Sequence, residues 1–208
     1  MGSARNVRMS LHYPLTLNQN INKIMTKKEV QQRVLQDGKP LPLDKFEWDE
    51  KTYTFSSIED NLVIDFRTID DCTFHTGYNC TFHTGSACTF NTGSHCTFDT
   101  GYGCTFKTGS NCTFKTGFGC TFKTGYDCTF DTGFDCTFDT EYGCTFKTGE
   151  HCVAVRWDIY GVIKIPANTE IKLNECGVQG YQIINQSVGK RVKIKLSNDQ
   201  IVEGELIE

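Results

Sequence analysis

The sequence has no excess of positive charge and no long apolar run, and each absence excludes a class of protein. Lys and Arg together number 21 against 25 Asp and Glu, so the net charge is −4 and no basic field attracts nucleic acid. No stretch approaches the ~18 apolar residues that a membrane span requires, and the amino terminus lacks the apolar core of a signal peptide. We therefore expect no membrane contact and a cytoplasmic or virion-associated location.

The sequence is also poor in motifs that carry chemistry. It contains no Cys-x-x-Cys pair of the kind that binds zinc, and no Ser/His/Asp grouping, Gly-rich phosphate loop or paired-carboxylate spacing. His75, His83, His95 and His151 are scattered rather than grouped. We expect no enzymatic activity, no bound metal and no cofactor.

What the sequence does contain is one octapeptide, Cys-Thr-Phe-x-Thr-Gly-x-x, repeated ten times without insertion over residues 72–151. A fixed short period indicates an architecture in which each unit buries its apolar face against its neighbours. We number the positions of this octad one to eight, from Cys to the last variable residue. Ile64-Asp65-Phe66-Arg67-Thr68 is expected to be a degenerate first unit in the same register, and Cys152 continues the register at the other end.

The first five positions of each octad favour a short strand, and Gly at position six supplies a turn. Side chains alternate along a strand, so Cys and Phe share one side, which we predict to be the core, while the polar position four faces outward. The predicted core is a Phe ladder, beginning at Phe66, beside a Cys ladder. Its repeat members are Cys72, Phe74, Cys80, Phe82, Cys88, Phe90, Cys96, Phe98, Cys104, Phe106, Cys112, Phe114, Cys120, Phe122, Cys128, Phe130, Cys136, Phe138, Cys144, Phe146 and Cys152.

Position five, the second Thr, is expected to lie at a corner, where its hydroxyl bonds to the backbone of the turn. The cysteines are expected to be small buried hydrophobes in a reducing, intracellular setting rather than a disulfide scaffold. Glu141 stands where every other copy has Gly. If that position requires a positive φ, Glu141 costs about 1 kcal/mol.

Two closures of the array are open. Two octads per turn make a flattened two-sheet coil, and the charges mildly favour this arrangement, because alternate octads then stack Asp99, Lys115, Asp131 and Lys147 with alternating charge. The companion stack does not alternate so cleanly: His75, Asn91, Lys107, Lys123 and Asp139. Alternatively, three chains intertwine with one octad per side of a triangular prism. That period is similar to the octapeptide β-prisms of phage tail spikes, although those repeats place Val two residues before Gly. The oligomeric state, monomer or trimer, is open.

The flanking segments are expected to cap the array. Met25-Thr26 is typical of a natural start, which makes residues 1–24 an extension, a docking arm or a non-native leader. In the cap of residues 25–63, Thr26 and Glu29 match a capping box, and Val30, Val34 and Leu35 at helical spacing predict a helix that stops at Gly38. Strands are expected in the cap over residues 46–48 and 52–55, and over 62–66 leading into the solenoid of residues 64–152.

Residues 153–208 are expected to form a β-rich carboxy-terminal module. Its predicted strands are residues 153–157, 162–165, 170–173, 181–184, 192–196 and 201–207, the last two forming a hairpin through residues 197–200. Residues 189–206 resemble the opening hairpin of Sm-like RNA-binding domains, but the second Sm half is absent. We do not expect nucleic acid as a partner.

The variable positions suggest how such a rod could act. Position seven carries aromatic residues that either pack on one another at the corner or form a partner surface. The candidates for that surface are Tyr102, Phe118, Tyr126, Phe134 and Tyr142. Thr73, Thr81, Thr89 and their successors could form an ice-binding ladder, but the charged fourth position breaks the flat face that this role needs. Mimicry of nucleic acid, as in acidic pentapeptide-repeat solenoids, is opposed by Lys107, Lys115, Lys123 and Lys147.

The array resembles the Cys-Thr-Phe octapeptide repeats of uncharacterised phage, giant-virus and bacterial proteins. The resemblance covers residues 64–152 and, more loosely, the leader from Met25. It implies a viral or prophage setting and no known activity. We expect an all-β octapeptide-repeat solenoid with a small helix-containing amino-terminal cap and a β-rich carboxy-terminal module. Its expected role is non-catalytic: it presents a rigid surface to a protein partner or to other copies of itself, with a trimeric spike or fibre component as the alternative.

Overall fold

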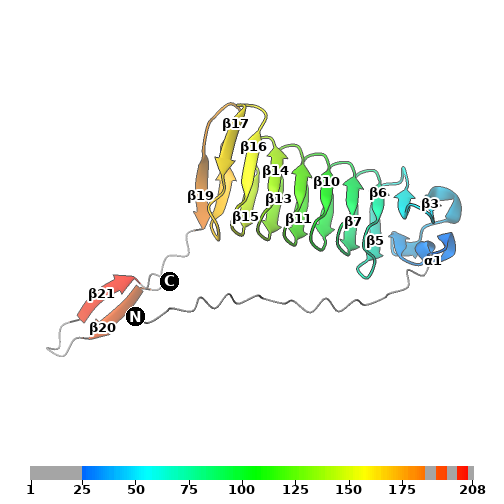
Figure 1. Ribbon diagram of the computed structural model, residues 1–208, viewed down its shortest axis with the longest axis horizontal. Helices are drawn as coiled ribbons and strands as arrows, with labels where there is room; N and C mark the ends of the chain where they lie inside the picture. Colours follow the sequence, from blue (N-terminus) through cyan, green and yellow to red (C-terminus); the bar gives the residue numbers. More distant parts are fainter. Residues whose placement is uncertain (1–24, 186–190, 196–200, 206–208) are drawn as a thin grey trace, which may run out of the picture.

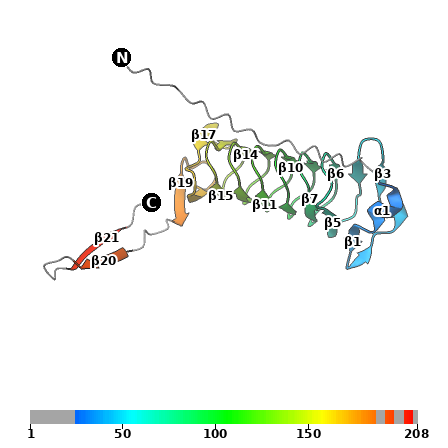
Figure 2. The same cartoon turned by 60° about the horizontal axis from the view of Figure 1, so that its bottom comes forward.

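Two sheets stack into a β-solenoid in the computed structural model, and a small cap covers its amino-terminal end (Figure 1 and Figure 2). The structure describes residues 25–185, 191–195 and 201–205, with side chains to residue 184. The extension of residues 1–24 and the turn of residues 197–200 lie outside the described residues. No helix among the described residues is long and apolar enough to cross a membrane.

Sheet A has ten strands, and the chain passes through it once in every coil. Strands β5 to β15 run parallel, and antiparallel strands close both ends of the sheet. Its members are β1 Val34–Gln36, β2 Lys39–Pro40, β5 Leu62–Phe66, β7 Thr81–Thr84, β9 Thr97–Asp99, β11 Thr113–Thr116, β13 Thr129–Thr132, β15 Thr145–Thr148, β18 Glu170–Leu173 and β19 Tyr181–Asn185.

Sheet B has nine strands and forms the other wall. Strands β4 to β16 run parallel, between the antiparallel end strands β3 and β17. Its members are β3 Glu47–Asp49, β4 Thr54–Ser56, β6 Thr73–His75, β8 Thr89–Asn91, β10 Thr105–Lys107, β12 Thr121–Lys123, β14 Thr137–Thr140, β16 Val153–Arg156 and β17 Gly161–Lys164. A separate two-stranded sheet pairs β20 Arg191–Lys195 with β21 Ile201–Glu205.

The coil contains two octads, as the alternating charges favoured. Phe114 pairs with Phe98 and with Phe130, sixteen residues away on either side, and all three lie in sheet A. The octads between them supply sheet B, where Phe106 pairs with Phe90 and Phe122. Each coil of this structure therefore closes within one chain, whereas the intertwined prism would place these strands in different chains.

Phe side chains from both sheets fill the space between the walls. Within a sheet, successive rings are parallel, as in Phe106 and Phe122, whose centroids lie 4.8 Å apart at 3°. Between sheets, rings meet edge to face, as in Phe106 and Phe114 at 5.2 Å and 75°. Such aromatic pairs contribute about 0.5–1.5 kcal/mol beyond the area they bury. The ten Phe and eleven Cys residues of the predicted ladders are all buried, with at most 2% of their surface exposed.

One register prediction was wrong. Ile64, not Phe66, pairs with Phe82, and Phe66 pairs with Thr84 at the corner. The first unit therefore begins at Leu62 and is longer than an octad, because residues 67–71 make a wider loop before Cys72. Phe66 still enters the core, since its side chain is fully buried and its ring meets Phe74 edge to face at 5.4 Å.

The amino-terminal cap contains a shorter helix than its apolar spacing predicted. Helix α1, Lys27–Gln31, begins with the predicted capping box, in which the Thr26 side chain accepts from the Glu29 amide and Glu29 reaches back. It ends before Val34, which instead lies in β1 and pairs with Ile64. Val34 adopts a strand rather than a helix because β1 then pairs with β5 and covers its open edge. A short 3₁₀ helix, η1 Leu43–Lys45, follows.

Candidate functional site

The corners of the coils carry the exposed aromatic residues, and two octads per turn divide these residues between two opposite corners. We call the corner that leads from sheet A to sheet B the AB corner, and the return the BA corner. Tyr102, Phe118 and Phe134 lie on the AB corner, whereas Tyr126 and Tyr142 lie on the BA corner. The five residues of the predicted surface therefore do not form one row.

The three aromatic residues of the AB corner form a continuous stack. The rings of Tyr102 and Phe118 are 5.0 Å apart at 3°, and those of Phe118 and Phe134 are 4.9 Å apart at 2°. Exposed fractions are 52% for Tyr102, 43% for Phe118 and 48% for Phe134, so the ring edges face solvent. On the BA corner only Tyr126 and Tyr142 stack, at 5.4 Å.

The backbone beneath the stack is held by hydrogen bonds that run along the solenoid axis. The Gly103 amide donates to the Phe118 carbonyl and the Gly119 amide to the Phe134 carbonyl, both at 2.9 Å. The Gly117 amide donates to the Gly101 carbonyl at 3.0 Å. These bonds repeat at every coil, so the rings stand on a backbone whose spacing is fixed by the sheets.

Position six needs Gly because the coils approach closely there, not because φ is positive. A Cβ on Gly117 would lie 3.0 Å from the Tyr102 nitrogen of the neighbouring coil. The positive φ falls instead at position eight, in Asn79, Ala87, His95, Gly103, Asn111, Gly119, Asp127, Asp135, Gly143 and His151. Glu141 has no positive φ. At the BA corner the Gly125 amide donates to the Gly109 carbonyl, but the Glu141 amide makes no corresponding hydrogen bond to the Gly125 carbonyl.

Position five behaves as the sequence predicted. The Thr hydroxyl donates to the carbonyl of the following residue, as in Thr116 to Gly117 at 3.3 Å and Thr132 to Gly133 at 3.4 Å. Thr76 is the exception in the series, because its buried hydroxyl oxygen has no hydrogen-bond partner within the described part of the chain.

Beside the AB stack there is open space at two glycines. Gly103 and Gly119 follow Tyr102 and Phe118, and a Cβ at either glycine would meet no atom within 4 Å. The far end of this corner is charged, with His151 Nδ1 3.4 Å from an Asp135 carboxylate oxygen. The AB corner thus offers a partner three ring edges, with open space beside two of them at Gly103 and Gly119.

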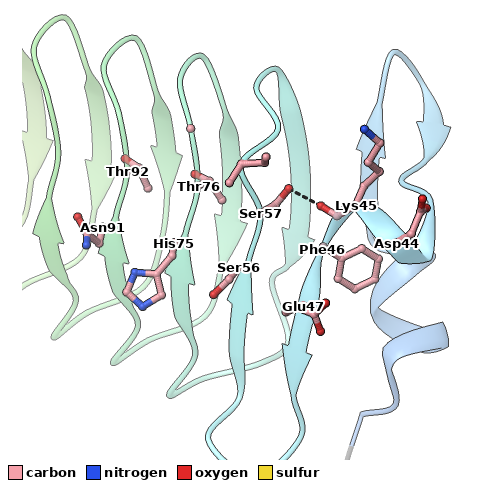
Figure 3. A pocket seen from close by; sticks show the side chains of 12 residues that line it. Asp44, Lys45, Phe46, Glu47, Ser56, Ser57, His75, Thr76, Asn91 and Thr92 are labelled. Carbon is pink, nitrogen blue, oxygen red and sulfur yellow. Dashed lines mark hydrogen bonds between the residues drawn. The ribbon is translucent and has the colours of Figure 1, made fainter.

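A second candidate is a groove where the cap meets sheet B, with a volume of 680 Å³ (Figure 3). Glu47, Ser56, His75 and Asn91 stand at matched positions on successive strands along it. Its lining is Asp44, Lys45, Phe46, Glu47, Ser56, Ser57, Ile58, His75, Thr76, Gly77, Asn91 and Thr92. The sequence analysis missed this groove, because it arises from the packing of β3 against the first coils.

Two polar residues of this groove, Lys45 and Ser57, already bond to other residues of the cap. The Lys45 ammonium lies 3.0 Å from a Glu59 carboxylate oxygen, and the Ser57 hydroxyl donates to the Lys45 carbonyl at 2.8 Å. The hydrogen bond from Lys45, and a second from Gln36, hold the pKa of Glu59 below its ordinary value. Glu47 is also paired, with its carboxylate 3.3 Å from the Lys27 ammonium. The rest of the polar lining includes Asp44, His75, Asn91 and the Thr76 hydroxyl, and among the described residues no three His, Cys, Asp or Glu side chains gather here to hold a metal ion.

The cysteines form two buried ladders rather than one. Cys80, Cys96 and Cys112 follow one another sixteen residues apart, and each thiol donates to nearby backbone carbonyls, as Cys96 does to Ser94 at 3.6 Å. The hydrogen bond with the Cys128 thiol, followed by burial, raises the pKa of Cys112 to about 11, against an opposing contact with Cys96. Cys176 is exposed, and none of the cysteines is in a disulfide.

Charged and hydroxyl ladders cover the outer faces of both sheets. In sheet A, Lys115 lies between Asp99 and Asp131, and His83 Nδ1 lies 3.6 Å from Asp99. The threonines at position two stand in register beside these charges, as Thr113 does between Thr97 and Thr129. Among the described residues no group of three or more His, Cys, Asp or Glu side chains is placed to hold a metal ion.

No protein-family model, curated protein or solved structure matches this chain. The fold and its surfaces are therefore the basis for assigning a function.

Proposed function

We propose that this chain is a non-catalytic interaction protein that presents the AB corner to a protein partner. One observation carries the proposal: the exposed, parallel stack of Tyr102, Phe118 and Phe134. Aromatic side chains dominate the binding energy of protein interfaces, because they bury a large area and lose little conformational entropy.

The rigidity of the corner supports the same role. The backbone bonds of Gly103 and Gly119 set the ring spacing before a partner arrives, so binding would not have to pay the entropy of ordering a loop. The open space at these glycines allows a partner to approach the rings from one side. A partner would fit this surface if it carried an apolar ridge against the three rings and a polar group beside Asp135 and His151.

The location that we propose follows from the resemblance to phage, giant-virus and bacterial repeats, namely a virion or the cytoplasm of a host cell. Buried free thiols support a reducing setting, since small buried hydrophobes of this kind are stable there without disulfides.

The test is a selection of displayed peptides or small domains on the intact chain, followed by binding measurements on variants. Serine at Tyr102, Phe118 and Phe134 together should weaken the selected binders at least tenfold, because each buried aromatic contributes roughly 1–2 kcal/mol or more. The matched control is serine at Tyr126 and Tyr142, which removes the other stack. Circular dichroism checks that both variants remain folded.

Binders that hold both variants equally well would refute the AB corner as the interaction site. Binders lost only on the control variant would move the site to the BA corner.

A further inference from the structure

The carboxy-terminal end of the core is not fully covered by the solenoid itself. Strand β18 pairs with β15 and buries Ile171 and Leu173 completely or nearly so. Strand β19 then adds one more strand, with Ile183 opposite Ile171 and Tyr181 opposite Leu173. Directly opposite residues share a face of a sheet. Ile183 and Tyr181 therefore face the core side, yet 46% and 37% of their surfaces are exposed.

The opposite wall closes only part of this end. Arg156 is fully buried, and it donates to the carboxylate of Asp158 and to the carbonyls of Val178 and Glu175. These bonds fasten the loop before β19 across one side of the core. Figure 1 shows β17 and β19 as the last strands of the two walls. With residues 25–185 in place, about half of the Ile183 surface stays exposed.

The chain continues into the hairpin of β20 and β21, which pairs with no other strand among the described residues. β20 and β21 pair with Ile194 opposite Val202 and Lys193 opposite Glu203. The sequence of β20 alternates charged and apolar residues, and such alternation is typical of a sheet with one side covered and one side in water. An isolated two-stranded hairpin is marginally stable in water. This hairpin needs a surface for its apolar side.

We propose that strands β20 and β21 pack the apolar side that their sequence predicts on Tyr181 and Ile183 of the same chain and cover the end of the core. Residues 186–190 join β19 to β20, and five extended residues span at most ~17 Å. Stacked sheets lie about 10 Å apart, so a five-residue connection is long enough to let the hairpin pack on β19. A short tether also gives the same-chain hairpin a millimolar effective concentration, which favours it over a second copy.

The first test uses the unmodified full chain and follows backbone hydrogen exchange. Amides of residues 201–205 should exchange at least roughly a hundredfold more slowly than in an unstructured peptide, because the docked hairpin opens only with its support. Exchange at the rate of an unstructured peptide would overturn the proposal.

The second test is a double-mutant cycle in the full chain. Ile183→Ser and Ile194→Ser should each lower Tm by about 2–4 °C and raise the fluorescence of a dye that binds apolar surface. The double variant should resemble either single one, because both changes break the same contact. Val162→Ser is the matched control, since Val162 is 70% exposed and pairs with Val155 on the outer face, and it should not raise dye binding.

Additive effects of the two substitutions, or no effect of Ile183→Ser, would overturn the contact. Light scattering distinguishes the source of the hairpin. A monomer at all concentrations supports packing within one chain, whereas a dimer that Ile194→Ser dissociates would show that the hairpin covers a second copy and would overturn the same-chain proposal.

Discussion

Ala87 and Gly103 lie one above the other at the AB corner, joined through the Ala87 amide, which donates to the Tyr102 carbonyl at 2.9 Å. Both have left-handed backbone, with φ of 56° for Ala87 and 66° for Gly103. A residue with a Cβ is strained in this region by roughly 1 kcal/mol, whereas Gly is not. The same corner thus occurs with and without the strain in one chain.

The substitutions Ala87→Gly and Gly103→Ala should change the free energy of unfolding in opposite directions. Ala87→Gly should raise the free energy of unfolding slightly, since the relief of backbone strain outweighs the greater freedom of Gly in the unfolded chain. Gly103→Ala should lower it by about 1 kcal/mol, because no neighbouring atom interferes and only the backbone term remains. Urea unfolding measures both. Equal losses from the two substitutions would contradict the backbone explanation.

The alternating charges of sheet A give a second prediction. Lys115→Glu would place three like charges in a row with Asp99 and Asp131, and should cost up to about 1 kcal/mol. Lys107→Glu is the control in sheet B, because its neighbours are Asn91 and Lys123 and the change creates an opposite-charge pair. Thermal unfolding at low salt compares the two, and 1 M salt should reduce the difference. If both variants lose the same stability, lateral charge pairing is not the cause.

The buried pair of Arg156 and Asp158 predicts a loss of stability in acid. Burial alone would raise the pKa of Asp158, but the hydrogen bonds from Arg156 and from the Gly177 amide outweigh it, and the pKa falls below its ordinary value. A carboxylate with a lowered folded pKa stabilises the fold above its unfolded pKa, near 3.9. That contribution is lost as pH falls through the lower folded value.

Asp158→Asn should remove this acid-dependent part of the stability curve. At neutral pH the variant should also lose several kcal/mol, about 3–5, because Arg156 remains buried without its partner charge. Unfolding free energies from pH 7 to pH 2 measure both effects. A variant with an unchanged acid profile would show that other carboxylates control it.

Thiol chemistry tests the Cys ladders. Only Cys176 is exposed, so one thiol of twelve should react rapidly with a thiol reagent in the native chain at pH 8, and all twelve after unfolding. The pKa of Cys112 and that of Cys104 are raised to about 11, so these two thiols stay protonated at that pH. The hydrogen bond with Cys128 lowers the pKa of Cys144, and it is burial that keeps this thiol from the reagent. Cys176→Ser should abolish the rapid reaction. Several fast thiols in that variant would mean that the coils open.

The sequence predicted those parts of the fold that repeat. The period predicted that Phe114 lies in the core. The charges of Asp99, Lys115 and Asp131 favoured two octads per turn, because only then do opposite charges lie on neighbouring strands, as they do in sheet A. The departures came where repetition ends. Val34 has helical spacing from Val30 but pairs with Ile64, since the open edge of β5 outweighs a weak local preference.

The candidate surface was predicted only in part. Position seven identified the aromatic residues, but not their division between corners, although the parity of the octads already separates Phe118 from Tyr126. The groove beside His75 and the exposed Ile183 depend on how end strands pack, and no local pattern encodes that packing.

The sixteen-residue pairing also constrains how the gene can change. Phe114 contacts Phe130 because two octads complete one coil, so a duplication of sixteen codons inserts a full coil and returns the chain to the same wall. A gain or loss of eight codons would exchange the walls downstream and bring β16 and β17 beside the wrong neighbours. Inherited changes in rod length should therefore come in even numbers of repeats.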